Sequence, residues 1–422
     1  MENFDFLLPL KVPFQLLKIF GFWFDENASK SYKMYGILLH VILADLFVIG
    51  QFVEFFRVDG LFVKTLIIAV SFTFLGASIK TKNVMIVSKK IVEIIADLKE
   101  IIALLDSNVS DLRILKGKSR QVTKFFWVYW IMCLIVISWG SFIPWINYFQ
   151  NPEPPYKLLY PTWSPFNHEQ NIFGFVIVSF YESLTSGVFC GVVVAEDIFP
   201  VYFFNIISGM LQELNERISY ITKKRENSGN GESTGKRTKH DEHFMELLRC
   251  VEIHHRIKKV IQKVENIFSA MIVIQGIMSV ILICTIAFTL SKMSIMSEPS
   301  LFIFMFTYMV PMILEIFLPC YFGNEVSLAS QKFSTTLFHI DWIEEDKNFK
   351  SAMKMVLENT KTPIKIAAAQ GVFPVNLWTF LRIINSAFSV YAVLQSMKGI
   401  STTTASHSIH QNMRNSESLK FQ

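Results

Sequence analysis

The segment at residues 374–398 reads PVNLWTFLRIINSAFSVYAVLQSMK. It is long enough to cross a bilayer as one helix, since about 20 residues at 1.5 Å each span the hydrocarbon core. Six of its residues recur at gaps of 3, 4, 3, 4 and 3, which places them on one helix face. They are Thr379, Arg382, Ser386, Ser389, Val393 and Ser396. We call this face the polar stripe.

A stripe of hydroxyl groups and one arginine is costly against lipid, so it is expected to face protein or water. One interpretation is that it lines a water-filled path. The alternative is that its small polar residues let neighbouring helices approach closely. The segment taken alone leaves both open.

The composition of the whole chain indicates a polytopic membrane protein. Of 422 residues, 51% are hydrophobic and 18% are charged, and the mean hydropathy is +0.38. No dense basic tract points to nucleic acid. The sequence carries no HExxH, GxSxG or dinucleotide fingerprint, and its five cysteines form no CxxC. We therefore expect no enzyme, no cofactor and no metal site.

Apolar segments recur along the whole chain. Seven are long enough to span a membrane, at residues 35–56, 61–79, 125–149, 172–210, 267–290, 300–322 and 374–398. The sequence therefore predicts an all-α membrane protein with seven transmembrane helices.

The distribution of positive charge predicts the orientation of these helices. Lys and Arg number 32 in the segments at 1–34, 80–124, 211–265 and 324–365, against 7 in the intervening loops and the tail. Because positive residues favour the cytoplasmic side, the N-terminus is expected to be cytoplasmic and the C-terminus extracellular.

Several apolar segments continue past the membrane. The fourth runs on without a break signal beyond residue 210, and residues 82–115 and 242–265 are amphipathic at helical spacing. These extensions predict a packed cytoplasmic domain, with helices lying flat on the membrane surface as the alternative. The Gly/Ser/Lys-rich stretch at 223–241 is expected to be a disordered insertion.

The chain is accordingly divided into five parts. We expect a cytoplasmic segment at 1–34, six transmembrane helices with a ligand pocket at 35–322, a cytoplasmic assembly region at 323–373, the seventh helix at 374–398 and a disordered extracellular tail at 399–422.

Aromatic and small polar residues gather in the predicted outer halves of four helices. Such a lining suits a small apolar ligand held by few hydrogen bonds, although aromatic residues also anchor helices at membrane interfaces. The candidates are Phe72, Thr73, Phe74, Trp139, Phe142, Phe180, Tyr181, Ser183, Phe304 and Tyr308. Asp45 and Glu182 are intramembrane acids, expected to serve either a function or a structural pairing, with His40 or Lys64 as partners of Asp45.

Short motifs in this chain resemble those of the insect odorant receptors. They are LKIFGFW at 17–23, FGNE at 322–325, HIDW at 339–342, KIAAAQGVFP at 365–374, LWTF at 377–380 and SVY at 389–391. The layout is similar over nearly the whole chain. It departs from the family pattern in the 223–241 insertion and in Gln370-Gly371, where many members have Gly-Gly or Gly-Lys.

This resemblance implies a tetrameric, odorant-gated, non-selective cation channel in the plasma membrane of a sensory neuron dendrite. It implies that this chain is the odorant-specific subunit, working with a shared co-receptor subunit. The seventh helix would line the pore, with Ser386 and Ser389 on its wall and a constriction at Val393, Ser396 and Met397. The implied odorant pocket lies among helices two, three, four and six.

Three other classes are weighed against this one. A G-protein-coupled receptor keeps its N-terminus outside, which the charge distribution opposes, and its signature motifs are missing from the sequence. A transporter would want inverted repeats, broken helices or clustered intramembrane acids. A gustatory-type ligand-gated channel is the most similar alternative class, and only finer differences in the motif sequences distinguish it from an odorant receptor.

Overall fold

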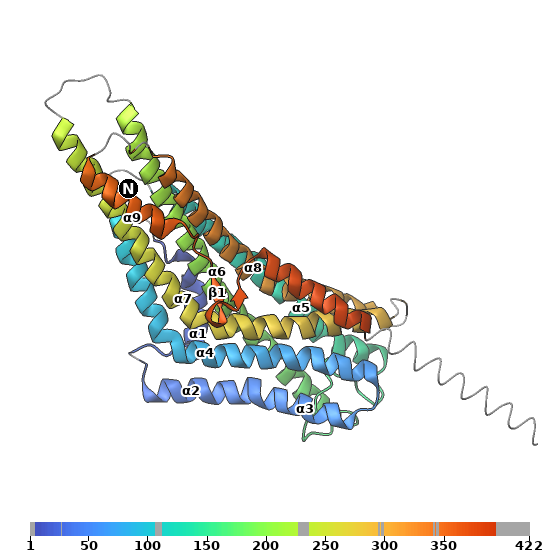
Figure 1. Ribbon diagram of the computed structural model, residues 1–422. Helices are drawn as coiled ribbons and strands as arrows, with labels where there is room; N and C mark the ends of the chain where they lie inside the picture. The colour runs from blue at the N-terminus through green and yellow to red at the C-terminus, as the bar shows by residue number, and fades with distance from the viewer. Residues whose placement is uncertain are drawn as a thin grey trace, which may run out of the picture.

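A computed structural model describes residues 5–26, 28–105, 112–226, 236–293, 296, 299–340, 342 and 346–393, with side chains at 220–243 left aside. Six long helices have the length and apolar composition to cross a membrane, and a seventh, shorter one follows at Leu377–Val393 (Figure 1). The predicted all-α fold with seven transmembrane helices is confirmed, and residues 394–398 of the seventh segment lie outside the described residues.

The helices occur along the chain in the predicted order. The first span joins α2 (Lys30–His40), a π-helical turn (Val41–Asp45) and α3 (Leu46–Arg57). The other long helices are α4 (Leu61–Leu105), α5 (Arg113–Gln150), α6 (Ile172–Glu226), α7 (Lys236–Lys292) and α8 (Pro299–Phe338). Shorter elements are the 3-10 turns Leu8–Leu10 and Ala369–Gly371, α1 (Lys11–Ile19), α9 (Lys347–Thr360), β1 (Ala367–Ala368) and β2 (Phe373–Pro374).

The long helices extend well beyond a bilayer. α6 has 55 residues, which is about 80 Å of helix against a hydrocarbon core of about 30 Å. The predicted continuation of the fourth segment as one helix is therefore confirmed. α6 and α7 also run into the 223–241 stretch from either side, and residues 227–235 lie outside the described residues.

The amphipathic extensions pack against one another. Ile94 and Leu98 of α4 are buried in one core with Ile257 and Val260 of α7, and the ends of α6, α7 and α9 gather at the upper left of Figure 1. The predicted packed domain is confirmed for these residues, because their apolar faces cover each other instead of a membrane surface.

A short hairpin leads into the C-terminal helix. Its two strands pair Ala367 with Pro374 and Ala368 with Phe373. It is fixed to α7 by two side chains: Glu265 accepts a hydrogen bond from the backbone N–H of Ala367 (2.8 Å) and Ser269 accepts one from Ala369 (2.7 Å). Asn376 then caps the C-terminal helix by accepting from the N–H of Thr379 (2.9 Å).

Gly323 allows the approach of this connection to α8. A Cβ built on Gly323 would lie 2.4 Å from the backbone oxygen of Val375. We expect Gly323→Ala to displace the start of the C-terminal helix and to destabilise the fold by about 1–3 kcal/mol, as overpacking does. The melting temperature of the detergent-purified protein measures the effect. Gly187→Ala is the control, because no atom lies within 4 Å of a Cβ there, and equal melting of the two variants would contradict the prediction.

Candidate functional site

A cavity of about 90 Å³ lies between α4, α5, α6 and α8. These four helices are the second, third, fourth and sixth spans, where the family resemblance places a pocket. One water needs about 10–15 Å³ by this measure, so a small organic molecule is a suitable occupant. The lining residues are Val70, Thr73, Phe74, Ala77, Tyr129, Cys133, Val136, Ile137, Tyr160, Ser186, Phe189, Cys190, Val193, Val194, Tyr308, Pro311 and Met312.

Two hydroxyl groups meet in the wall of this cavity. Thr73 Oγ1 donates to the backbone oxygen of Ala69 (2.9 Å) and is hydrogen-bonded to the Tyr308 hydroxyl. Since a threonine hydroxyl has one proton, the Tyr308 hydroxyl is the donor in the second bond. The Tyr308 ring is stacked on Phe304 at a centroid distance of 5.8 Å. The Tyr308 oxygen is therefore held in place with its lone pairs available to a ligand donor.

A third hydroxyl comes from α6. The Ser186 hydroxyl is buried and makes no hydrogen bond of good geometry within the described residues, with the Tyr160 hydroxyl close by. Burying a hydroxyl whose neighbour is poorly aligned is unfavourable. A ligand that supplies a hydrogen bond to Ser186 would recover this cost, so the cavity suits a mainly apolar molecule with one polar group.

The structure brings only some of the predicted ligand residues to the cavity. Thr73, Phe74 and Tyr308 line it. Four other predicted residues lie inside the bundle and pack beside the cavity. Trp139, Tyr181 and Phe304 belong to the apolar cluster around Phe47 and Phe189. Phe72 belongs to a second apolar cluster, around Ile286 and Met312.

Three predicted residues lie elsewhere. The Ser183 hydroxyl donates to the backbone oxygen of Ser179 on its own helix (2.8 Å). Phe142 and Phe180 are 62% and 67% exposed and do not reach the cavity in this chain. Their role in ligand binding stays a prediction.

The sequence reasoning missed much of the lining. Cys133, Val136 and Cys190 are small apolar residues that any transmembrane helix contains, so no signal marked them. Tyr160 comes from the loop between α5 and α6, which lies outside the apolar segments.

A buried ion cluster lies beside the cavity. Lys80 Nζ lies 2.8 Å from Asp197 Oδ1 and is also paired with Glu315, and all three side chains are less than a tenth exposed. Asp45 forms a second, more exposed group: Lys82 lies 2.9 Å from it, and His40 lies 3.6 Å from it. His40 is linked to Asp45 through Ser78, which donates to Asp45 Oδ1 (2.9 Å) and is hydrogen-bonded to His40 Nε2 (3.0 Å), and Lys82 takes the place expected for Lys64.

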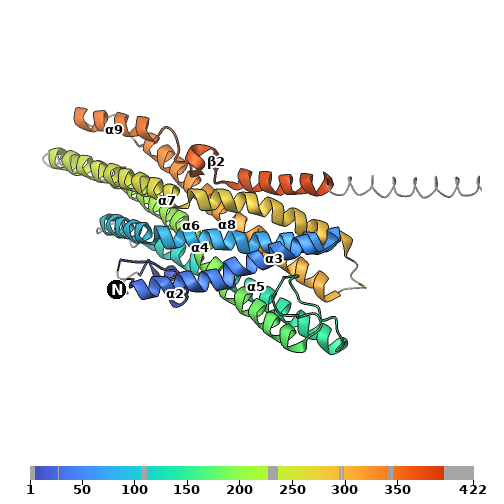
Figure 2. The same cartoon turned by 90° about the horizontal axis from the view of Figure 1, so that it is seen from below.

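The C-terminal helix places most of the polar stripe on the outside of the chain. Ile383 and Ala387 are buried, and Ala387 packs in a cluster with Ile283 and Cys284 of α7. The exposed stripe residues are Arg382, Ser386, Ser389 and Val393. In Figure 2 this helix runs along the edge of the bundle.

The start of the stripe differs from its middle. Thr379 is buried, and its hydroxyl is hydrogen-bonded to the backbone oxygen of Pro374. The hydroxyls of Ser386 and Ser389 donate to backbone oxygens of their own helix, at 2.8 and 2.9 Å. Ser396 and Met397 lie outside the described residues, so the predicted constriction is described only at Val393.

The chain is similar to known proteins in both sequence and structure. The sequence model of a family described as 7tm Odorant receptor matches residues 62–388. Odorant receptor 94a of Drosophila melanogaster is 33% identical over 160 residues, which is 38% of this chain and 41% of that protein. Odorant receptor 2a of the same species is 21% identical over 374 residues, covering 88% of this chain and 92% of that protein.

The fold has a solved counterpart. The insect olfactory receptor OR5 from Machilis hrabei, in a structure in complex with eugenol, superposes with a TM-score of 0.73 at 17% identity. The superposition covers 92% of this chain and 97% of that one. At this identity the likeness concerns the arrangement of the helices.

Proposed function

This chain belongs to the 7tm Odorant receptor family, and we propose that it is the odorant-specific subunit of a ligand-gated, non-selective cation channel. A small volatile ligand binds in the cavity between α4, α5, α6 and α8. The C-terminal helix lines a pore, and the complex includes a co-receptor subunit. The channel works in the plasma membrane of a sensory neuron dendrite.

The observation that carries the proposal is the position of the polar stripe. Arg382, Ser386 and Ser389 are exposed on a helix that belongs to a membrane-spanning bundle. The Arg382 guanidinium is costly in lipid, and the Ser386 and Ser389 hydroxyls, although bonded to their own helix, add polar atoms to the same face, so this face favours water or other protein. A pore surrounded by the equivalent helices of several subunits supplies both, which supports a channel assembled from more than one chain.

The binding half of the proposal rests on the cavity. Its wall is mainly apolar, with the Tyr308 oxygen and the Ser186 hydroxyl as polar groups. This chemistry suits small volatile compounds that carry one hydroxyl, carbonyl or ether group.

Whole-cell recording tests the proposal directly. The chain is expressed with and without the co-receptor subunit, and a panel of volatile odorants is applied. We expect a rapid cation current that appears only when both subunits are present. No current despite surface expression of both subunits, or a response that requires G-protein signalling, would contradict the proposal.

Tyr308 is expected to set odorant sensitivity. Tyr308→Ala removes the ring from the cavity wall and the hydroxyl that bonds Thr73, so the half-maximal odorant concentration should rise roughly tenfold, the equivalent of about 1.4 kcal/mol. Dose–response curves at matched surface expression measure the shift. Phe173→Ala is the control, because Phe173 is 75% exposed on α6. Unchanged curves for a full odorant panel would count against this cavity as the binding site.

A further inference from the structure

Tyr129 of α5 belongs to both the cavity and the ion cluster. The residue lines the cavity, and its hydroxyl donates a hydrogen bond to Asp197 Oδ2 (3.2 Å). Both side chains are almost fully buried. The Tyr129 hydroxyl therefore links the wall of the cavity to a carboxyl group that lies outside the cavity.

The ion cluster connects three helices through one shared cation. Lys80 of α4 bonds Asp197 of α6 through Oδ1 and is also paired with Glu315 of α8. Two carboxylates share one ammonium group, so the position of the Lys80 nitrogen depends on the other hydrogen bonds that each carboxylate accepts. The bond from Tyr129 satisfies Asp197 and not Glu315. Any change in that bond alters the balance between the two carboxylates.

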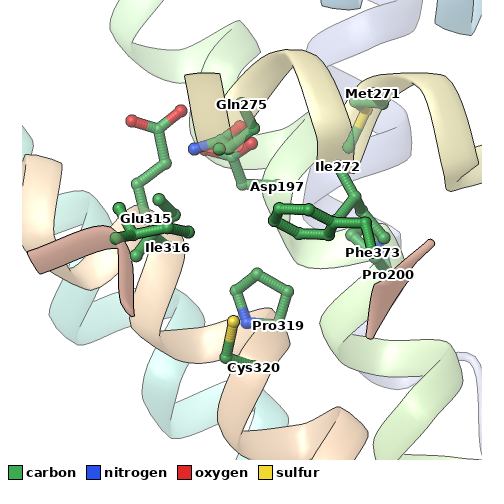
Figure 3. Close-up of a pocket in the computed structure, with 12 residues that line it drawn as sticks. Asp197, Pro200, Met271, Ile272, Gln275, Glu315, Ile316, Pro319, Cys320 and Phe373 are labelled. Atoms are coloured by element: carbon green, nitrogen blue, oxygen red, sulfur yellow. The ribbon is translucent and has the colours of Figure 1, made fainter. Parts of the chain in front are cut away.

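A second cavity lies between the ion cluster and the segment that carries the C-terminal helix. Asp197 and Glu315 line this cavity, of about 20 Å³, together with Phe373 of β2 and Ile383 of the C-terminal helix (Figure 3). α8 contacts this helix a second time through Phe317 and Phe380, whose ring centroids are 5.4 Å apart. The ion cluster thus lies between the first cavity and the residues that hold the C-terminal helix.

We propose that Tyr129 is a positioning residue that couples the occupancy of the cavity to the C-terminal helix through Asp197, Lys80 and Glu315. A ligand in contact with the Tyr129 ring displaces its hydroxyl relative to Asp197. Lys80 then shifts between its two carboxylates, and this shift changes the wall that Asp197 and Glu315 form opposite Ile383 and Phe373 in the second cavity. The inference rests on the proposed channel function, which it extends by naming the connection between binding and opening.

A positioning residue can be told apart from one that selects ligands. Tyr129→Phe keeps the ring in the cavity wall and removes only the bond to Asp197. We expect the half-maximal concentrations of chemically different odorants to shift by one common factor, between about 2- and 30-fold, with their rank order unchanged. Tyr308→Phe is the matched control: its hydroxyl is bonded to Thr73 and not to the ion cluster. There the shift should differ from odorant to odorant.

A double-mutant cycle gives a second measurement. Asp197→Asn should produce a common shift of its own, and the double variant Tyr129→Phe/Asp197→Asn should deviate from the sum of the single effects. Tyr129→Phe combined with Phe173→Ala should be additive, because Phe173 is 75% exposed on α6 and lines neither cavity. All variants are compared at equal surface labelling, beside the wild-type channel.

The outcomes separate the two proposals. Shifts for Tyr129→Phe that vary among odorants, shifts below twofold for all of them, or additivity with Asp197→Asn would each overturn the coupling role while the wild-type current stands. A wild type that reaches the surface with the co-receptor and carries no odorant-evoked current contradicts the channel function, and the inference with it.

Discussion

Lys80→Met is expected to destabilise this protein by about 3–5 kcal/mol, the range measured when one partner of a buried ion pair is removed. The Lys80 side chain is 3% exposed and is the cation in contact with both Asp197 and Glu315. Methionine fills a similar volume but leaves two carboxylates buried beside each other. Water cannot solvate them there, so the loss exceeds that of a surface ion pair.

The melting temperature in detergent and the fraction of protein at the cell surface measure this effect. The matched control is the triple variant Lys80→Met, Asp197→Asn, Glu315→Gln, in which the carboxylates become neutral amides of the same shape. Most of the lost stability should return, since the cost comes from unpaired charge and not from lost packing. If the single variant melts like the wild type, the three residues do not form a buried cluster in the folded protein.

The helices were predictable because their signals lie in the sequence itself. Apolar runs of sufficient length gave all seven spans, and charged positions between apolar ones predicted the extensions of α4 and α7. The ends of the helices were harder to predict, because a helix can continue beyond the apolar residues that cross the membrane. α8 accordingly runs from Pro299 to Phe338, past the apolar segment at 300–322.

The cavity was only partly predictable. Aromatic residues in the outer halves of helices indicated the four helices that surround the cavity, yet Phe142 and Phe180 are exposed while Thr73 and Tyr308 line the cavity. Sequence spacing places a residue on a helix face but does not say which neighbour covers that face. That information comes from the packing of several helices at once.

The ion cluster was missed, although a signal for it exists. Lys80 lies at the start of the positively charged segment 80–124 and Asp197 lies in the second half of the apolar segment 172–210, so neither stands out in the sequence. Glu315, however, lies within the apolar segment at 300–322. An acid in such a run calls for a partner, and the cation at the end of the second span is the one that the fold supplies.

Val393→Lys is expected to reduce the odorant-evoked cation current about tenfold or more. Val393 is the last described residue of the polar stripe and is exposed on the C-terminal helix. A fixed positive charge in a narrow pore repels a cation by about 1.4 kcal/mol or more at close range, and each such step is a factor of ten. The reversal potential of the current should also shift toward the equilibrium potential of the permeant anion.

The charge, rather than the length of the new side chain, is what the experiment varies. Val393→Glu places a chain of similar length and opposite charge at the same position, so it should preserve or increase the cation current, whereas general damage to the helix would lower both. Ser396→Lys should act like Val393→Lys if the stripe continues along the same face. Should both lysine variants reach the surface and conduct normally with unchanged selectivity, the stripe would not line a pore. Its hydroxyls would then have to be explained by close contact with a neighbouring helix, the interpretation that the sequence first left open.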